Sequence, residues 1–521
     1  MSAPLLELLL RRYRLKAEAV PVVERLIKAW DQGHTALQLD PAEARLFEGS
    51  AAISRGGEPK PLVLQPGRLL QSWRLYQAEQ RIHAKLLGLA QVPAEMPTSP
   101  VAKALVQLWP SAADAQRQAA ELGLTKRLAL ITGGPGTGKT YTAARLLALL
   151  SLQTPGFRFA LAAPTGKAAQ RLGESVAKAS HQLPEALAGQ AGVLEQAGRQ
   201  ACTLHRLLAW RPGADKCGYN AGRTLPFDGV LVDEASMLDV MLWDALLQAL
   251  GPRTRLIVLG DHRQLESVEP GRVLGGLVEA ADVPGALQGC HVELRTNHRF
   301  AAHPGIGQLA QAIRDHQVEP LAVKSDEVEL FGSGDLDVAL GRVWPEVLAL
   351  ATATGPGPAL TALGHLRVLC ALNDGPWGVD GLNQRIERRL AAEGLARHAS
   401  PVLVRVNDAH SGLFNGDLGV ILPWESGFAA CFGDADQPRV LPLTHLPDHG
   451  VAWAMTVHRS QGSEYQRVLL VLPPEPHELV GPELLYTAVT RAKAWVGIVA
   501  DPAVLEAGVK ARPRRLTGLA I

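Results

Sequence analysis

The segment from Gly133 to Thr140 restricts the fold of this chain more than any other feature, because it reads Gly-Gly-Pro-Gly-Thr-Gly-Lys-Thr. It follows the apolar run 128–131 and precedes the helix-like segment 143–150. A glycine loop between a strand and a helix predicts a phosphate-binding loop, since glycines let several backbone N–H groups point at one phosphate chain. We therefore expect an α/β domain that binds a nucleoside triphosphate.

The loop also predicts which residues hold the nucleotide. The Lys139 ammonium would reach the β- and γ-phosphates, and the Thr140 hydroxyl would ligate Mg²⁺. The nucleotide-binding residues expected in the loop are Gly133, Gly134, Pro135, Gly136, Thr137, Gly138, Lys139 and Thr140.

A second motif, Gly229-Val-Leu-Val-Asp233-Glu234, is an apolar strand that ends in two carboxylates. Asp233 would hold the Mg²⁺ shell, and Glu234 would act as general base toward the attacking water. A chance Asp-Glu pair after a strand is common, so this assignment depends on Lys139 lying upstream in the same array of strands and helices. The pair favours nucleotide hydrolysis over phosphoryl transfer to a substrate.

Three further polar residues are candidates for sensing the γ-phosphate. Gln264 follows the apolar run 256–259, where an amide could contact both the phosphate and a neighbouring element, although a solvated loop explains this segment equally well. Arg299 and Arg491 could act as arginine fingers that reach the phosphate only when a cleft closes. A single arginine is more often a surface charge, so these two roles depend on the whole set.

Composition sets the class of protein. A chain of 521 residues predicts about two to four domains. Its 52 basic and 51 acidic residues neither indicate nor exclude nucleic acid, because binding needs only a local basic track. Five scattered cysteines without zinc-ligand spacing predict reduced thiols, and no apolar run reaches the roughly 18 residues of a membrane span. We expect a soluble, cytoplasmic protein.

The pattern of apolar, glycine and proline residues divides the chain into segments. Residues 1–90 are expected to form amphipathic helices, for example at 21–30 and 70–78, and the proline-spaced segment 92–100 is expected to be a linker. Strand candidates at 157–162, 229–232 and 256–259 alternate with helical segments, which is typical of a doubly wound α/β domain. The glycine-proline stretch 354–358 is expected to be a flexible junction. Short β-like runs lie at 402–406, 418–422 and 440–443, and they predict a small β insertion.

These motifs together resemble the superfamily 1 helicases of the 5′→3′ branch, and most closely the RecD family, the alpha subunits of exodeoxyribonuclease V. The resemblance spans about residues 110–500 in the family's order. The matching segments are 116–120, 163–169, 203–208, 232–237, 260–268, 297–299, 375–383, 415–420, 454–464 and 486–491. It implies two RecA-like P-loop domains at 101–330 and 331–521, an N-terminal helical domain at 1–100 that docks partners, and an SH3-like insertion at 396–450.

The resemblance also implies roles that the bare residues leave open. Gln116 would read the adenine edge, and Glu464 would contact the sugar side of the nucleotide. Residues expected to line a single-stranded DNA track are Pro164, Thr165, Lys167, His205, Thr456 and His458. Hydroxyl, imidazole and amine donors suit phosphate oxygens, but a helix-capping threonine or a packed histidine is the alternative for each. Arg459 stands where many relatives carry lysine, and Trp210, Phe414 and Trp453 are candidates for stacking on bases.

The implied function is an ATP-driven 5′→3′ DNA helicase that acts on single-stranded and tailed duplex DNA in double-strand-break repair and recombination. Its partners would be RecB- and RecC-type subunits, and exonuclease V activity would belong to the complex, because the chain shows no carboxylate-lysine nuclease constellation. One alternative is a stand-alone helicase of the RecD type, although those relatives carry longer N-terminal extensions with helix-hairpin-helix elements. Another is an ATP-gated scaffold that does not unwind DNA.

Overall fold

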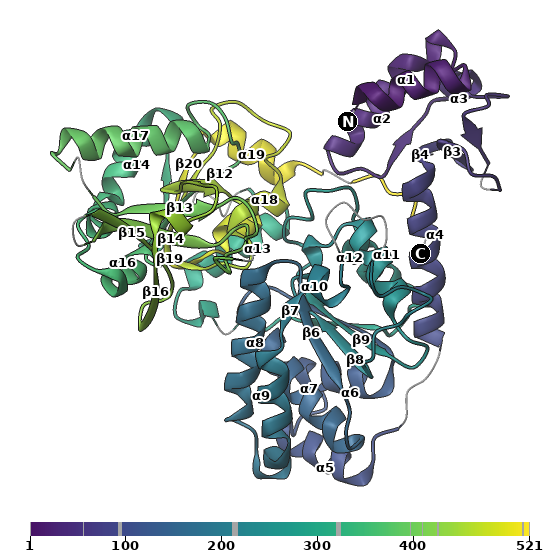
Figure 1. Cartoon of the computed structure of the whole chain (residues 1–521), viewed down its shortest axis with the longest axis horizontal. Helices are drawn as coiled ribbons and strands as arrows, with labels where there is room; N and C mark the ends of the chain where they lie inside the picture. Colours follow the sequence, from purple (N-terminus) through teal and green to yellow (C-terminus); the bar gives the residue numbers. More distant parts are fainter. Residues whose placement is uncertain are drawn as a thin grey trace.

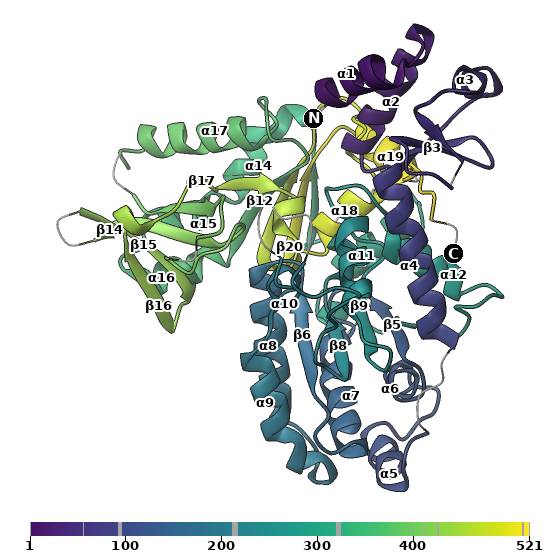
Figure 2. The same ribbon diagram turned by 45° about the vertical axis from the view of Figure 1, so that its right-hand side comes forward.

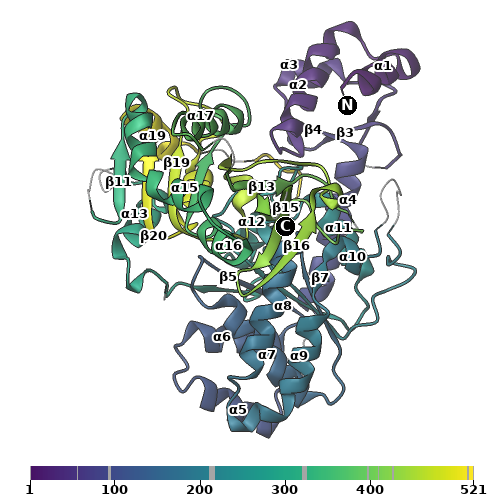
Figure 3. The same cartoon turned by 60° about the vertical axis from the view of Figure 1, so that its left-hand side comes forward.

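The computed structural model of the chain describes residues 2–55, 57–91, 96–210, 217–297, 299–318, 325–395, 398–408, 410–424, 427–512 and 515–519. Within these residues the strands form four sheets. Two are parallel and each builds one α/β domain, one lies in an N-terminal domain, and one is an antiparallel insertion in the second α/β domain. Figures 1 and 3 show the N-terminal domain and the second α/β domain side by side above the first α/β domain.

The N-terminal domain combines helices with a four-stranded sheet in the order β1-β4-β3-β2. Its elements are α1 (Ser2–Tyr13), α2 (Val20–Asp31), β1 (Ala36–Gln38), α3 (Pro41–Leu46), β2 (Ile53–Ser54), β3 (Leu62–Gln65), β4 (Leu69–Ser72) and α4 (Trp73–Gln91). The helix expected at 21–30 is present as α2, but of the helix expected at 70–78 only 73–78 are helical, because 70–72 belong to β4. The expectation of a purely helical region was wrong, because Pro66-Gly67 turns the chain between two leucine-rich runs that pair as antiparallel strands.

Helix α4 connects the N-terminal domain to the first α/β domain and packs along helix α11 (Val240–Ala249), as Figure 2 shows. Its buried residues Ile82 and Leu86 belong to the same apolar core as Leu246 of α11. A bidentate ion pair fixes the two helices, with 3.0 Å from Arg81 Nε to Asp244 Oδ1 and 2.6 Å from Arg81 Nη2 to Asp244 Oδ2. The core of the first α/β domain therefore extends into α4.

Replacing Arg81 with alanine should destabilise this contact. The Asp244 side chain is only 9% exposed, so the variant leaves a largely desolvated carboxylate without its partner. Because Arg81 itself is 42% exposed, we expect a loss of about 1–3 kcal/mol and a lower midpoint of urea unfolding. The exposed Arg68, which lies in the turn before β4, gives the matched control Arg68→Ala. Equal midpoints for the two variants would contradict the prediction.

The first α/β domain is built on a six-stranded parallel sheet in the order β10-β5-β9-β8-β6-β7. Its strands are β5 (Leu128–Gly133), β6 (Phe159–Ala163), β7 (Cys202–Thr203), β8 (Gly229–Val232), β9 (Arg255–Gly260) and β10 (His291–Leu294). Its other helices are α5 (Ser99–Leu108), α6 (Ala115–Thr125), α7 (Lys139–Gln153), α8 (Gly166–Ser180), α9 (Ala191–Arg199), α10 (Leu204–Leu207) and α12 (Val273–Ala281). The strands expected at 157–162, 229–232 and 256–259 are β6, β8 and β9, and their carboxyl ends meet at one edge of the sheet. Of the expected linker at 92–100, residues 92–95 lie outside the described residues, and α5 begins at its end.

The second α/β domain has a five-stranded parallel sheet in the order β11-β20-β19-β12-β18. Its strands are β11 (Val328–Phe331), β12 (Leu366–Cys370), β18 (Ala454–Thr456), β19 (Tyr465–Val471) and β20 (Ala492–Val499). Its helices are α13 (Pro304–Arg314), α14 (Leu336–Arg342), α15 (Trp344–Ala351), α16 (Pro356–Leu363), α17 (Val379–Ala392), α18 (Pro482–Val489) and α19 (Pro502–Lys510). Because Phe300 and Ile306 pack in the core of this sheet, we propose a domain boundary near residue 300 rather than at 330.

The glycine-proline stretch at 354–358 is the start of α16 and not the flexible junction that we expected. Gly355 adopts a φ of +100° as the residue before the helix, and Pro356 occupies the first helical position, where its missing N–H costs nothing. The expected β insertion is present as an antiparallel sheet in the order β16-β15-β14-β13-β17, with β13 (Ser400–Val404), β14 (Leu418–Trp424), β15 (Gly427–Asp434), β16 (Gln437–Pro442) and β17 (His449–Val451). In the described part of the chain, no helix has the length and apolar character needed to cross a membrane.

Candidate active site and nucleic-acid track

The phosphate loop connects β5 to α7 and forms a cradle that only small residues permit. Gly136 and Gly138 have φ of +80° and +87°, a region that side chains disfavour. A Cβ atom would also meet Tyr486 at Gly134, Arg299 at Gly136 and the Gln116 amide at Gly138. The glycines therefore leave a space that a phosphate chain can fill at the N-terminus of α7.

Hydrogen bonds hold the loop in shape. Lys139 Nζ donates to the carbonyl oxygens of Gly133 at 2.6 Å and Gly134 at 3.1 Å, and Thr137 Oγ1 donates to Gly134 at 2.9 Å. Asn297, which follows β10, also contacts the loop, because its Nδ2 donates to Pro135 O at 2.8 Å. The Lys139 ammonium is thus directed into the loop, where it can reach phosphate oxygens.

Asp233 and Glu234 follow the carboxyl end of β8, next to the phosphate loop. Glu234 has a φ of +52°, an uncommon conformation for a residue with a side chain, and its N–H donates to Asp233 Oδ1 at 2.8 Å. Burial raises the pKa of both carboxyls, and the Asp233 charge raises the pKa of Glu234 further. Lys139 opposes the rise for both groups, and Arg491 opposes it for Glu234. A strained, buried carboxyl with a raised pKa suits a general base.

The residues expected to act in hydrolysis meet in one cavity between the two α/β domains. Its volume is about 280 Å³. The first domain contributes Lys139, Thr140, Asp233, Glu234 and Gln264, and the segment between the domains and the second domain contribute Arg299, Glu464 and Arg491. These residues are up to 352 positions apart in sequence, from Lys139 to Arg491, so their convergence depends on the packing of the two domains.

Gln264 and the next residue bridge the two domains. Arg491 Nη2 donates to Gln264 Oε1 at 3.1 Å, and Gln264 Nε2 donates to Asp261 Oδ2 at 3.2 Å. Leu265 N donates to Thr487 Oγ1 at 2.8 Å, and Gln461 Nε2 donates to Leu265 O at 2.7 Å. The segment after β9 is therefore in contact with the cavity on one side and with the second domain on the other.

Arg299 and Glu464 form an ion pair across the cavity, and Lys493 Nζ lies 3.5 Å from the second oxygen of Glu464. Burial alone would raise the pKa of Glu464, but the charges of Arg299 and Lys493 outweigh it and lower the pKa. Both partners were expected to contact the nucleotide, Arg299 at the γ-phosphate and Glu464 at the sugar. Their ion pair links the segment after β10 to the second domain.

Gln116 lies at the start of α6, where Trp109 Nε1 donates to its Oε1 at 3.0 Å and Asp114 Oδ1 accepts its backbone N–H at 2.7 Å. It lines a second cavity of about 820 Å³ together with Thr137 of the phosphate loop, His291 and Arg295. The amide therefore lies beside the nucleotide loop, at a cavity large enough for a base.

The described donors fit a magnesium ion held mainly by the nucleotide. The Thr140 hydroxyl and the Asp233 carboxylate both line the cleft cavity, and Mg²⁺ takes oxygen ligands, commonly one or two from the protein with phosphates and waters. A cation at Asp233 would also offset the burial that raises its pKa. Among the residues that the structure describes, no group of three or more histidine, cysteine or acidic side chains could hold a metal ion without a nucleotide.

Sequence reasoning missed Tyr486. Its hydroxyl lies beside Gly134, and burial together with its hydrogen bond to Asp261 raises its pKa well above the usual value. The residue belongs to the segment 486–491 that carries Arg491, but a tyrosine gives no sign in sequence that it reaches the phosphate loop of another domain.

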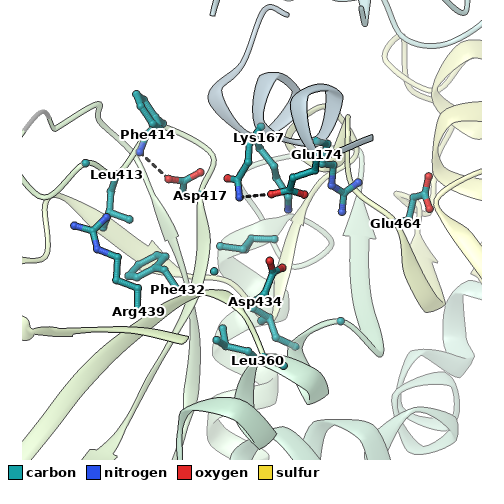
Figure 4. Close-up of a pocket in the computed structure, with 18 of the residues that line it drawn as sticks. Lys167, Glu174, Leu360, Leu413, Phe414, Asp417, Phe432, Asp434, Arg439 and Glu464 are labelled. Carbon is teal, nitrogen blue, oxygen red and sulfur yellow. Dashed lines mark hydrogen bonds between the residues drawn. The ribbon is translucent and has the colours of Figure 1, made fainter. Parts of the chain in front are cut away.

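Part of the expected DNA track lies between α8 and the insertion, where Pro164, Thr165 and Lys167 are half-buried. Pro164 and Thr165 connect β6 to α8, and Thr165 Oγ1 caps the helix by accepting the Ala168 N–H at 3.2 Å. Lys167 lines a cavity of about 500 Å³ between α8 and the insertion, opposite Asp417 and Phe414 (Figure 4). Burial, with some help from the nearby charge of Arg171, lowers the pKa of Lys167. The Phe414 side chain is 42% exposed and covers Gly166.

The other expected DNA contacts lie apart from this cavity. His205 on α10 is exposed, with its ring centroid 5.4 Å from that of Trp210. Thr456 is buried at the end of β18, where its Oγ1 accepts the Arg459 N–H at 3.4 Å. Burial and the charge of Arg515 lower the pKa of the neighbouring His458.

The candidates for base stacking differ in access. Trp453 is buried and its indole N–H donates to Glu387, whereas Phe414 is exposed. Phe414 is thus better placed for stacking than Trp453.

Comparisons with known proteins give a family. The model described as an AAA domain matches residues 116–270, and that of the UvrD-like helicase C-terminal domain matches residues 451–499. The RecBCD enzyme subunit RecD of Mycobacterium tuberculosis is 39% identical over 484 residues, which cover 89% of this chain and 81% of that protein. The ATP-dependent RecD2 DNA helicase of Deinococcus radiodurans is 32% identical over 70% of this chain and 46% of its own length. A structure of a Bacteroides Pif1 helicase with ADP-AlF3 and single-stranded DNA matches 81% of this chain and 95% of that one with 17% identity and a TM-score of 0.39.

The match to the mycobacterial subunit covers 89% of this chain, and the two domain models fall on the phosphate-loop domain and on the segment 451–499, which contains β18, β19, β20 and Arg491. The chain belongs to the RecD family of RecBCD enzyme subunits.

Proposed function

We propose that this chain is the ATP-driven 5′→3′ DNA helicase of a RecBCD-type complex that acts in double-strand-break repair and recombination. The observation that carries the proposal is the contact between Gln264 and Arg491 in the cleft that also holds Lys139 and Glu234. It joins the hydrolytic residues of one domain to a cation of the other. A motor needs a contact between its nucleotide site and the other domain, because hydrolysis must change the relative position of the two domains.

The chain's own residues support a sequence of events. ATP binds with its phosphates on the loop N–H groups and Lys139. Thr140 and Asp233 would hold Mg²⁺, which would neutralise negative charge on the phosphates. Glu234 orients a water molecule and takes its proton. Arg299 and Arg491 stabilise the negative charge that develops on the γ-phosphate.

Opening and closing of the cleft would move the two halves of the DNA track relative to each other. Thr165 and His205 lie on the first domain, and Thr456 and His458 lie on the second. Contacts to phosphate oxygens hold a strand without reading its sequence, so alternate grip by the two halves can advance DNA of any sequence. The 5′→3′ direction is inherited from the family.

The partners follow from the family. The mycobacterial relative is a subunit of the RecBCD enzyme, and a RecD-type chain would bind RecB- and RecC-type subunits in the cytoplasm through its N-terminal domain. The stand-alone alternative is less well supported, since identity to the RecD2 helicase is 32% against 39% for the subunit. We assign exonuclease V activity to the complex and the motor to this chain.

ATP-dependent unwinding of duplexes with either a 5′ or a 3′ single-stranded tail tests the proposal. The purified chain should open the 5′-tailed duplex selectively, and Lys139→Ala should abolish opening because the phosphates lose their cation. The exposed Lys178 at the end of α8 gives the matched control Lys178→Ala, which should unwind as the wild type does.

Each other outcome has a distinct meaning. Opening from the 3′ tail alone would overturn the direction. DNA-stimulated ATPase without unwinding would indicate a motor that needs its complex, and reconstitution with RecB- and RecC-type subunits would then have to restore 5′-tail unwinding. ATP binding without DNA-stimulated hydrolysis in either setting would favour the ATP-gated scaffold.

A further inference from the structure

The C-terminal tail, residues 515–519, leaves the second α/β domain and ends against the N-terminal domain. Figure 1 shows the yellow end of the chain beside α4. Thr35 N donates to Leu516 O at 2.9 Å, and Leu516 N donates to His34 Nδ1 at 2.9 Å. Thr517 Oγ1 donates to the buried carboxylate of Glu79 at 2.8 Å. The tail is therefore fixed on the N-terminal domain by backbone and side-chain bonds.

On its way the tail places Arg515 against the segment that follows Gln264. Arg515 Nη2 donates to Ser267 O at 2.7 Å, and Nη1 donates to Gly271 O at 2.9 Å. Arg515 Nε lies 3.2 Å from Glu266 Oε2, and both side chains are less than 20% exposed. With a longer bond of 3.4 Å from Nη1 to Glu269 O, one guanidinium thus binds three carbonyl oxygens and a carboxylate of a single short segment, which a planar fork of five donors allows.

The N-terminal domain closes this contact from the other side. A Cβ atom at Gly33 would collide with the Arg515 guanidinium, so the glycine lets the cation lie flat against the backbone. Gly33 O also accepts the Gly271 N–H at 3.0 Å. Arg515 is therefore enclosed between the N-terminal domain and the segment 266–271.

The same segment is fixed at its inner end by the second α/β domain. Gln264 accepts from Arg491 in the nucleotide cavity, and Leu265 bonds to Thr487 and Gln461. Few residues separate Gln264, which contacts the second domain, from Ser267 and Gly271, which contact Arg515. A shift of 267–271 would therefore also move Gln264. Small displacements of a catalytic group cost large factors in rate.

We propose that Arg515 is a positioning residue that holds the segment 264–271, and through it Gln264, in the geometry needed for hydrolysis. This inference rests on the proposed function, because it assumes that Gln264 acts in ATP hydrolysis. Since the tail is anchored at Thr35 and Glu79, the N-terminal domain takes part in holding the loop. The partner-docking domain and the nucleotide cavity are thereby connected through one side chain.

Steady-state ATPase of the full-length chain with single-stranded DNA tests the proposal. Arg515→Ala should lower kcat by about ten- to a hundredfold and leave KM for ATP within about twofold, because the phosphate-binding residues stay in place. Arg515→Lys keeps the positive charge near Glu266 but loses the planar guanidinium, so its kcat should lie between those of the wild type and Arg515→Ala. The exposed neighbour Arg512 gives the matched control Arg512→Ala, with wild-type values expected. A wild-type kcat for Arg515→Ala would overturn the proposal.

A double-mutant cycle separates positioning from general stability. If Arg515 acts through Gln264, Arg515→Ala should change kcat by less than about twofold in a Gln264→Ala background. Hydrogen exchange of the backbone amides at 264–271 gives a readout without activity, and the exchange rate should rise in Arg515→Ala while α7 keeps its protection. Full additivity of the two substitutions, or unchanged exchange, would contradict the proposal. If the wild type shows no DNA-stimulated ATPase either alone or with RecB- and RecC-type subunits, the proposed function fails, and the exchange measurement on Arg515→Ala and Arg515→Lys alone decides whether Arg515 holds the segment.

Discussion

Replacing Glu234 with glutamine is expected to lower kcat for ATP hydrolysis by about 10²- to 10⁴-fold while ATP still binds. The amide keeps the size of the side chain but cannot take a proton from water. The phosphate loop and Lys139 are untouched, so the affinity for a fluorescent ATP analogue should stay near the wild-type value. Single-turnover hydrolysis and equilibrium binding of the analogue would measure the two quantities separately.

The pH dependence gives a second test of Glu234. A general base works only in its ionised form, and burial together with the Asp233 charge raises the pKa of Glu234. The wild-type kcat/KM should therefore fall as pH is lowered toward that raised pKa, and Glu234→Gln should lack this acid limb. Glu185→Gln, at an exposed carboxyl of the same domain, is the control and should keep the wild-type profile. Hydrolysis at the wild-type rate by Glu234→Gln would assign the base to another group.

Replacing Arg491 with alanine is expected to lower kcat by about 10³-fold or more, the effect typical of an arginine finger. Arg491 is 3% exposed and donates to Gln264 and to the carbonyl oxygens of Thr487 and Ser463. The variant removes a cation from the cavity and leaves the Gln264 amide without its partner in the second domain. DNA-stimulated ATPase and unwinding should both be lost, and Arg491→Lys should not restore them, because an ammonium cannot make the three bonds of the fork.

Arg491→Ala needs a control for folding, because three buried acceptors, Gln264 Oε1 and the carbonyl oxygens of Thr487 and Ser463, lose their donor. The exposed Arg388 on α17 gives Arg388→Ala, and circular dichroism melts of both variants should show the second α/β domain intact. An Arg491→Ala chain that stays folded and hydrolyses ATP within about tenfold of the wild-type rate would remove Arg491 from the catalytic set.

The parts of the fold that the sequence predicted are those with strong local signals. The strands β6, β8 and β9 and the phosphate loop between β5 and α7 are short apolar runs next to glycine or acidic residues, and their positions agree with the prediction. The sheet of the N-terminal domain was missed because its strands are two to four residues long, although Pro66-Gly67 between leucine-rich runs was a usable signal. At 354–358 glycine and proline do not form a turn but begin helix α16, because proline at the first helical position favours a helix.

For the site, sequence predicted residues but not their contacts. Lys139 lies in the loop-to-helix turn after β5, and Asp233 and Glu234 follow β8 of the same sheet, with β9 between the two strands. Parallel strands bring residues at their carboxyl ends together at one edge. The approach of Arg491 to Gln264 depends on how two domains pack, which no local pattern encodes. The same holds for Tyr486 beside Gly134, and for the position of Lys167 opposite Asp417 and Phe414 of the insertion.

The shared core of α4 and α11 has a mechanical consequence. Helix α4 has 19 residues, so it is a rod about 28 Å long that is buried along the first α/β domain and cannot bend away from it. A partner subunit bound to the N-terminal domain, as proposed above, would therefore also hold the first α/β domain in place. In the proposed complex the second α/β domain would then be the part that moves, and each ATP cycle would displace it relative to the first α/β domain and the bound partners.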